Sequence, residues 1–218
     1  MGKVEDKKKM KKEALLDSAL QLFTEKGLAE TSVSEIARDA QMAKGTFYLY
    51  FKDKYEIRDC LIARQTHFIF QKAHRELSAI FEEMAPEKVE DGIVYLLENI
   101  IDQFTENPEI LRFISKNLSW GVFSNLRIKD LANQNCMDIF DGILERSSRK
   151  YRQRELMIYM IVELVNSTCY NVILNHAPVS VQELKKELLC TVRGIMDQFA
   201  VAINDDGVYE LRKKSDML

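Results

Sequence analysis

Residues 44–51 place basic, hydrogen-bonding and apolar side chains on one short segment. Phe47 and Phe51 lie four positions apart, so in a helix both face the protein core. The other positions then point outward or lie along the helix edges: Lys44, Gly45, Thr46, Tyr48, Leu49 and Tyr50. A threonine hydroxyl can hydrogen-bond a base edge or a phosphate, a leucine can contact a thymine methyl group, and a glycine lets the backbone approach closely. The segment holds no acidic residue, and its outward chemistry fits double-stranded DNA.

Two preceding helices are expected to position this segment. Apolar residues recur at the spacing of one helical face: Leu15, Ala19, Leu22 and Phe23. The pattern ends at Lys26-Gly27, a basic residue followed by glycine, which is typical of a helix end. Ser32 and Glu35 then form a capping box that opens a second helix. Two short helices separated by about three residues make a helix-turn-helix.

Roughly residues 10–60 resemble the DNA-binding domain of tetracycline-repressor (TetR) type regulators. The resemblance rests on positions that agree in residue type and spacing across three helices. They include Ala19, Phe23, Gly27, Thr31, Ser32, Val33, Ile36, Ala37, Ala40, Lys44, Gly45, Thr46, Phe47, Tyr48, Phe51 and Lys54.

The resemblance implies a role for individual positions. Ser32 would cap the second helix and face a phosphate. Four residues would lie at the DNA surface of the recognition helix: Lys44, Thr46, Tyr48 and Tyr50. Lys54, at the start of the fourth helix, would reach a phosphate.

Two positions depart from the family pattern. Gln41 stands where the family usually has a turn glycine, and Ala43 stands where it usually has a serine cap. Each change costs about 1 kcal/mol of stability. We therefore expect the turn to form, but to be less stable than in the family pattern. The alternative is that these three helices only pack against the rest of the protein and do not bind DNA.

Charge is distributed unevenly along the chain. Residues 1–58 hold 12 Lys/Arg and 10 Asp/Glu, whereas residues 59–218 hold 19 and 24, which sum to the chain totals of 31 and 34. Six lysines fall within the first twelve residues. A polyanion would therefore meet the N-terminal end, where the lysines form either a solvated tail or an arm along phosphates.

Composition excludes several protein classes. With 8 Gly and 3 Pro in 218 residues, long helices are favoured over a many-turned sheet. The longest apolar run, 156–162, is too short to span a membrane, and no signal peptide is apparent. The four cysteines, Cys60, Cys136, Cys169 and Cys190, lack zinc or redox spacing and are expected as reduced core thiols. No cofactor or metal site is predicted, and a cytoplasmic location is expected.

The sequence predicts an all-α protein in four parts. These are a basic tail at 1–12, the helix-turn-helix domain at 13–58, a ligand-binding and dimerisation domain at 59–204, and a tail at 205–218. Helices in the larger domain are expected near 54–83, 87–106, 108–120, 128–147, 152–176 and 180–204, with a capping box at Ser180 and Glu183.

The last two helices are expected to form a dimer interface. The helix expected at 152–176 is apolar nearly all round from Leu156 to Val165, so it must be covered on both sides. The next helix carries an apolar seam, in which Leu188, Val192, Ile195 and Phe199 are assigned to the partner. A purely internal core role is the alternative.

An inducer pocket is implied by the family resemblance. Candidate lining residues are Phe113, Trp120, Phe123, Phe140, Tyr159, Asn166 and Tyr170. On the sequence alone, an aromatic residue of this kind is more often an ordinary core residue than a pocket residue. Glu163 lies in an apolar run and needs a partner, which is either another group in the dimer or a cationic ligand.

These observations favour a repressor. It would bind a pseudo-palindromic operator as a homodimer and leave DNA when a largely apolar small molecule fills the C-terminal domain. An enzyme is disfavoured because no phosphate-binding glycine loop, metalloprotease motif or nucleophile elbow occurs. The remaining alternative is a helical interaction protein that has lost DNA binding through Gln41 and Ala43.

Overall fold

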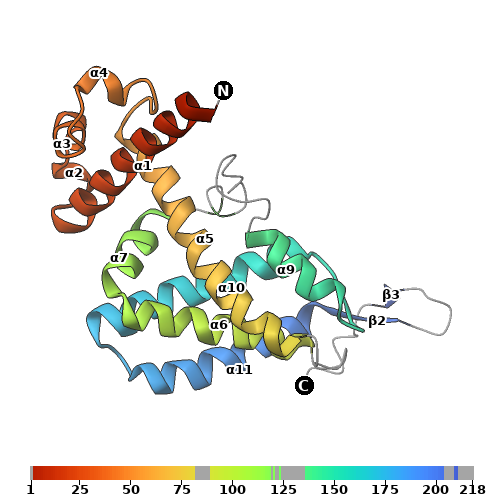
Figure 1. The fold of residues 1–218 in the computed structure, drawn as a ribbon. Coiled ribbons are helices and arrows are strands. Elements are labelled where there is room, and N and C mark those ends of the chain that lie inside the picture. The colour runs from red at the N-terminus through yellow and green to blue at the C-terminus, as the bar shows by residue number, and fades with distance from the viewer. Residues whose placement is uncertain are drawn as a thin grey trace.

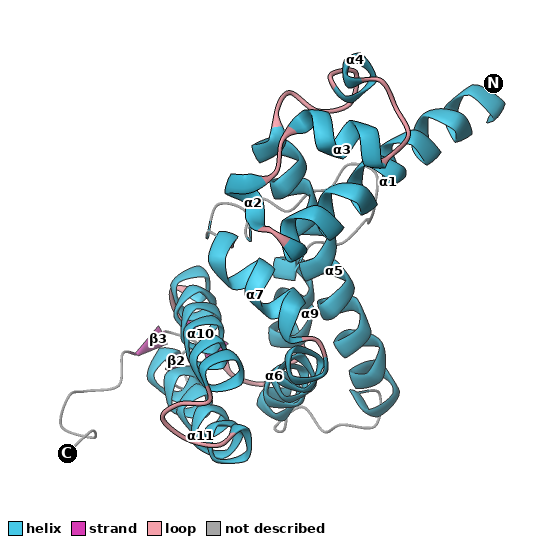
Figure 2. Ribbon diagram, turned by 90° about the vertical axis from the view of Figure 1, so that its left-hand side faces the viewer, coloured by secondary structure: helices cyan, strands magenta, loops and turns pink. Residues whose placement is uncertain are grey.

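The computed structural model describes residues 2–81, 89–118, 136–203 and 209–210, together with Trp120 and Phe123. Its fold is all-α, as predicted, with a small sheet that the sequence did not predict. Figure 1 shows a small N-terminal head and a larger helical body, joined by one long helix. The same two parts are seen from the side in Figure 2.

Four helices make up the head: α1 (Gly2–Glu25), α2 (Gly27–Glu30), α3 (Val33–Asp39) and α4 (Lys44–Phe47). Their core is built from the apolar faces that the spacing predicts, with Leu15, Ala19 and Ile36 fully buried. The chain turns between α1 and α2 at Gly27, whose φ of +87° suits glycine. The predicted capping box at Ser32 and Glu35 is present.

The next helix, α5 (Lys54–Phe81), runs from the head into the body without a break. The domain boundary predicted at residue 58 therefore falls inside a helix. The tail predicted at 1–12 also differs, because residues 2–12 continue α1 as regular helix. Lysine has good helix propensity, so the lysine-rich stretch extends a helix already anchored by Leu15 and Leu16.

The body contains α6 (Val89–Glu106), α7 (Pro108–Asn117), α9 (Cys136–Glu145), α10 (Arg154–Cys169) and α11 (Val181–Phe199). A π-helical turn, η2 (Tyr170–Leu174), continues α10. The capping box at Ser180 and Glu183 opens α11 as predicted. Parts of the helices expected at 87–106, 108–120 and 128–147 lie outside the described residues.

The helix predicted at 180–204 ends early. After Phe199 the chain becomes strand β2 (Ala200–Ile203), which pairs antiparallel with β1 (Lys150–Tyr151), Lys150 opposite Val201. β2 also pairs with β3 (Tyr209–Glu210). Pairing satisfies backbone groups that a longer helix would otherwise satisfy. Apart from β3, the predicted tail at 205–218 lies outside the described residues.

Candidate DNA-binding surface and ligand cavity

The predicted recognition segment folds as one helical turn followed by a tight turn. The side chains of Phe47 and Phe51 are buried and their ring centroids lie 5.7 Å apart. On the other side, Tyr48 is 53% exposed and Leu49 is 76% exposed. Lys44 and Gly45 are exposed, whereas Thr46 and Tyr50 are half-buried at the edges. The two phenylalanines thus anchor the segment and leave a mixed basic and apolar face in solvent.

The turn before this segment forms despite its unusual residues. Gln41 adopts φ +57°, the left-handed conformation expected there, and the backbone N–H of Met42 donates to the carbonyl of Ala37 at 2.8 Å. Ala43 precedes α4 without a side-chain cap. The turn is therefore intact, and the backbone bonds hold α4 against α3.

Ser32 is exposed at the start of α3, as a phosphate contact requires. Its hydroxyl accepts from the backbone N–H of Glu35 at 3.2 Å, and its own backbone N–H donates to Glu35 Oε2 at 2.8 Å. Lys26 Nζ lies 2.6 Å from the same carboxylate. Hydrogen bonds from Lys26 and Ser32 lower the pKa of Glu35 to about 2, so the cap remains ionised at neutral pH.

Lys54 does not occupy the predicted phosphate-facing position. Its ammonium group donates to the carbonyls of Leu28 at 2.8 Å, Ala29 at 3.1 Å and Thr31 at 3.1 Å. An ammonium has three donors, and all three point at the end of α2. Lys54 therefore ties the start of α5 to the junction of α2 and α3, a long-range contact that sequence spacing did not reveal.

The lysine-rich part of α1 lies beside the recognition segment. A surface groove of about 520 Å³ has Lys8, Lys9 and Lys12 on one wall and Leu49 and Tyr50 on the other. Acidic residues also line it, namely Glu5, Asp6 and Glu13. Lys7 and Lys11 are exposed but do not line this groove. One lysine face of α1 thus adjoins the recognition segment.

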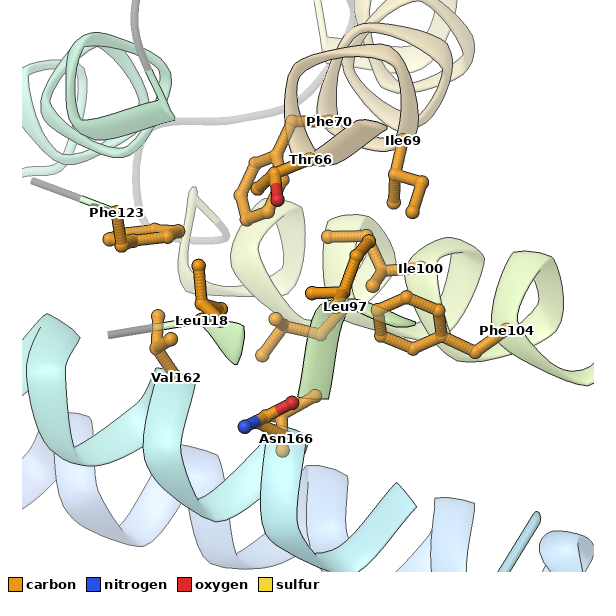
Figure 3. Close-up of a pocket in the computed structure, with 12 residues that line it drawn as sticks. Thr66, Ile69, Phe70, Leu97, Ile100, Phe104, Leu118, Phe123, Val162 and Asn166 are labelled. Carbon is orange, nitrogen blue, oxygen red and sulfur yellow. The ribbon is translucent and has the colours of Figure 1, made fainter. Parts of the chain in front are cut away.

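An apolar cavity of about 40 Å³ lies within the body. It is lined by side chains of α5, α6, α7 and α10, with Leu118 and Phe123 contributing beside them (Figure 3). The lining residues are Thr66, Ile69, Phe70, Leu97, Ile100, Phe104, Ile114, Leu118, Phe123, Val162, Val165 and Asn166. This volume holds a few water molecules at most, so an organic ligand would have to push the helices apart.

Comparison with known proteins identifies the head. Residues 15–59 match the family model described as bacterial regulatory proteins, tetR family. The chain is also 32% identical over 125 residues to the uncharacterized HTH-type transcriptional regulator YerO of Bacillus subtilis, a match that covers 49% of this chain and 41% of YerO.

The head, residues 15–59, is therefore a DNA-binding domain of the TetR type.

Two further matches extend into the body. The fatty acid metabolism regulator protein of Bacillus subtilis is 27% identical over 147 residues, covering 60% of this chain and 64% of that protein. FadR of Thermus thermophilus, solved in complex with lauroyl-CoA, superimposes with a TM-score of 0.60 at 17% identity, covering 85% of this chain and 94% of that one. The chain spans less than two thirds of the length of YerO and of the fatty acid regulator.

Two of the seven residues predicted to line a pocket do line this cavity, Phe123 and Asn166. Trp120 stands one layer behind, with its ring 5.5 Å from Phe123 and 5.2 Å from Tyr159. Phe140 packs against Phe70, which itself lines the cavity. These aromatic residues support the cavity wall rather than form it, and Tyr170 lies in η2, away from the lining.

Phe113 has a different position from the one predicted. It stacks on Phe23 of α1 with ring centroids 6.3 Å apart, so it joins the body to the head. The next residue on α7, Ile114, lines the cavity. On α5, Arg64 makes a similar link, since its guanidinium contacts Glu13 and Asp17 of α1, each at 2.9 Å. Thr66, two residues after Arg64, lines the cavity. Both helices therefore contact the head and the cavity at neighbouring positions.

Three of the four predicted dimer residues are wrong as a partner surface. Leu188, Val192 and Phe199 are buried within the protomer, and Ile195 is half-buried. The apolar seam of α11 faces the core of its own body, because α11 packs between α6 and α10. Three exposed apolar residues lie instead on α10, namely Leu156, Tyr159 and Met160.

The cysteines only partly match the expectation of core thiols. Cys136 and Cys169 are buried, and burial raises the pKa of each thiol to about 12. Cys60 is half-buried and Cys190 is exposed. Among the described residues, no group of three or more His, Cys, Asp or Glu side chains is placed to hold a metal ion.

Proposed function

We propose that this protein is a cytoplasmic repressor that binds a pseudo-palindromic operator as a homodimer and releases it when an apolar small molecule enters the body. The observation that carries the proposal is the recognition segment, in which Phe47 and Phe51 are buried while Tyr48 and Leu49 face solvent. A surface turn kept only for packing has no need of such exposed residues. Lys44 beside them supplies the positive charge that DNA binding requires.

Two findings weigh against the alternatives. The turn at Gln41 is intact, so the departures from the family pattern give no ground for lost DNA binding. The relatives named above are regulators, which favours binding over enzymatic activity.

Homodimer formation is supported by the uncovered face of α10. Arg154–Leu174 is apolar and long enough to cross a membrane by length and composition alone, yet only 39% of its most apolar stretch is buried in the protomer. Leu156 is 44% exposed and Met160 is 38% exposed. They lie four positions apart on one helical face with Glu163 close by. A second copy of this chain would cover that face, and Glu163 would lie within the same interface.

The ligand is expected to be a long acyl compound. The cavity lining is almost wholly apolar, and FadR of Thermus thermophilus is a structural neighbour in complex with lauroyl-CoA. The present volume of about 40 Å³ is far below that of a dodecyl chain. We therefore interpret this conformation as the ligand-free one, which a ligand would expand by separating α5, α7 and α10.

Expansion offers a physical route to release. The ligand must bind the DNA-free conformation more tightly than the DNA-bound one. Ile114 contacts the ligand space, while Phe113 beside it stacks on Phe23 of the head. A shift of α7 would thus tilt the head and change the spacing of the two recognition segments in the dimer. Half-sites lie about 34–36 Å apart on one face of the duplex, so a small change in spacing suffices to prevent simultaneous binding.

The test is a gel-shift experiment with the DNA upstream of the protein's own coding region. We expect one shifted species with dimer stoichiometry, and weaker binding to a scrambled duplex. Tyr48→Ala should reduce the difference between the two duplexes by about 1–3 kcal/mol if Tyr48 contacts a base. Equal affinity for both duplexes in the wild-type protein would contradict sequence-specific binding.

A further inference from the structure

The cavity contains one polar group whose hydrogen bonding is incomplete. Thr66 is 4% exposed, and its hydroxyl oxygen has no hydrogen-bond partner. Threonines elsewhere in the helices behave differently, because Thr105 donates to the carbonyl of Ile101 at 2.9 Å and Thr191 to that of Glu187 at 2.8 Å. Each uses the carbonyl four residues earlier, as helical threonines commonly do. Thr66 does not, and its hydroxyl faces the cavity (Figure 3).

A second polar group lies across the cavity. Asn166 projects from α10, on the wall opposite to α5, and its carboxamide is the other polar side chain in the lining (Figure 3). A buried hydroxyl without a partner lowers stability. A ligand in the cavity that accepts a hydrogen bond from the Thr66 hydroxyl would remove this cost.

The charge of the cavity lining limits which ligand groups can bind there. Among the described residues that line the cavity, none carries a charge. Burying an ionised carboxylate or phosphate there would leave the charge without a counter-ion, at a large energetic cost. The ligand atoms that enter the cavity must be neutral, and any ionised group must stay outside it.

We propose that Thr66 and Asn166 form a recognition site for a neutral carbonyl group carried on an apolar chain, such as that of an ester, thioester or ketone. The hydroxyl of Thr66 donates to the carbonyl oxygen, and the amide N–H of Asn166 approaches it from the other wall. Free fatty carboxylates are disfavoured. This inference rests on the ligand-binding part of the proposed function and names the group that the ligand must contain.

The experiment compares two probes of similar chain length, 2-undecanone and decanoate. Binding is followed in the intact protein by the fluorescence of Trp120, which stacks on Phe123 in the cavity wall. The variant is Thr66→Val, which has nearly the same shape but lacks the hydroxyl. Thr66→Ser retains a hydroxyl, and Thr105→Val removes a hydroxyl outside the cavity.

We expect the wild-type protein to bind 2-undecanone more tightly than decanoate at neutral pH. Thr66→Val should weaken ketone binding about fivefold to tenfold, the value of one hydrogen bond, whereas Thr66→Ser and Thr105→Val should bind it almost as the wild type does. Without ligand, Thr66→Val should melt at the same or a higher temperature, because it removes an unpaired buried hydroxyl. A residue with a purely structural hydrogen bond would give a lower melting temperature.

The possible outcomes separate the two proposals. If the ketone binds but Thr66→Val binds it equally well, or if that variant melts at a clearly lower temperature, the carbonyl site is wrong and the regulator proposal stands. Tighter binding of decanoate than of the ketone would also overturn the carbonyl site. If neither probe binds the wild-type protein, the ligand-binding part of the proposed function fails, and the carbonyl site fails with it.

Discussion

In the head, the residues that face DNA in our proposal lie within seven consecutive positions, 44–50, whereas in the body the cavity is lined by residues spread from 66 to 166. The recognition segment is held by two buried phenylalanines, so its outward side chains can change without repacking. Most cavity residues, in contrast, also belong to the core of the body. In the head, therefore, different residues provide stability and recognition, whereas in the body the same residues provide both. Four pairs of variants test this difference.

The largest effect is expected in the body. Phe199 is 4% exposed, so Phe199→Glu buries an unpaired charge and should destabilise the protomer by about 4 kcal/mol or more. Met160→Glu places the same charge on the uncovered face of α10 and should give a folded monomer. Circular dichroism and light scattering distinguish the two results. A Met160→Glu protein that remains a stable dimer would remove this face from the interface.

In the head, Phe47→Ala should lower the free energy of unfolding by about 3–5 kcal/mol, because it leaves a cavity in the core. Leu49→Ala should change stability by less than about 0.5 kcal/mol and weaken binding to operator more than to random duplex. Chemical denaturation and gel shifts measure the two quantities. Should Leu49→Ala alter stability and leave operator binding intact, the outward assignment of Leu49 would be wrong.

Two lysines provide the next comparison: in our account Lys54 stabilises the head and Lys44 contacts DNA. Lys54→Ala removes three hydrogen bonds to the end of α2 and should reduce stability by about 1.5–3 kcal/mol. Lys44→Ala should leave stability unchanged and flatten the salt dependence of DNA binding by about one unit per protomer. Melting temperatures and affinities at several salt concentrations test this. If Lys54→Ala instead left stability unchanged and flattened the salt dependence, Lys54 would be a DNA contact.

The smallest effect concerns the two lysine faces of α1. Lys8→Ala with Lys9→Ala removes two charges from the groove beside the recognition segment, and Lys7→Ala with Lys11→Ala removes two from outside that groove. The first pair should flatten the salt dependence by up to about two units per protomer and weaken all duplexes alike. The second pair should have the smaller effect. Equal effects would mean that these lysines act only through net charge.

Sequence patterns predicted the head more fully than the body for a physical reason. Capping at Ser32, the left-handed position at Gln41 and the burial of Phe47 depend on neighbours within a few residues, and the structure has all three. The triple contact of Lys54 spans more than twenty positions and left no local pattern.

In the body, helices were predicted from periodicity, but their relative orientation was not. The seam of α11 is visible in sequence, yet only packing against α6 and α10 shows that Leu188 and Val192 face inward. The cavity is lined mainly by aliphatic residues such as Leu97 and Ile100, which look like any core residue in sequence. The unpaired hydroxyl of Thr66 likewise appears only in three dimensions.

The central claim is that a ligand in the body releases DNA from the head. Its most direct test is the affinity of the wild-type protein for its upstream duplex, measured by fluorescence anisotropy at constant salt with and without saturating lauroyl-CoA, while Trp120 fluorescence reports ligand binding. We predict that the dissociation constant for the duplex rises at least about tenfold, a coupling of about 1.4 kcal/mol. An unchanged dissociation constant in the presence of bound lauroyl-CoA would contradict the account.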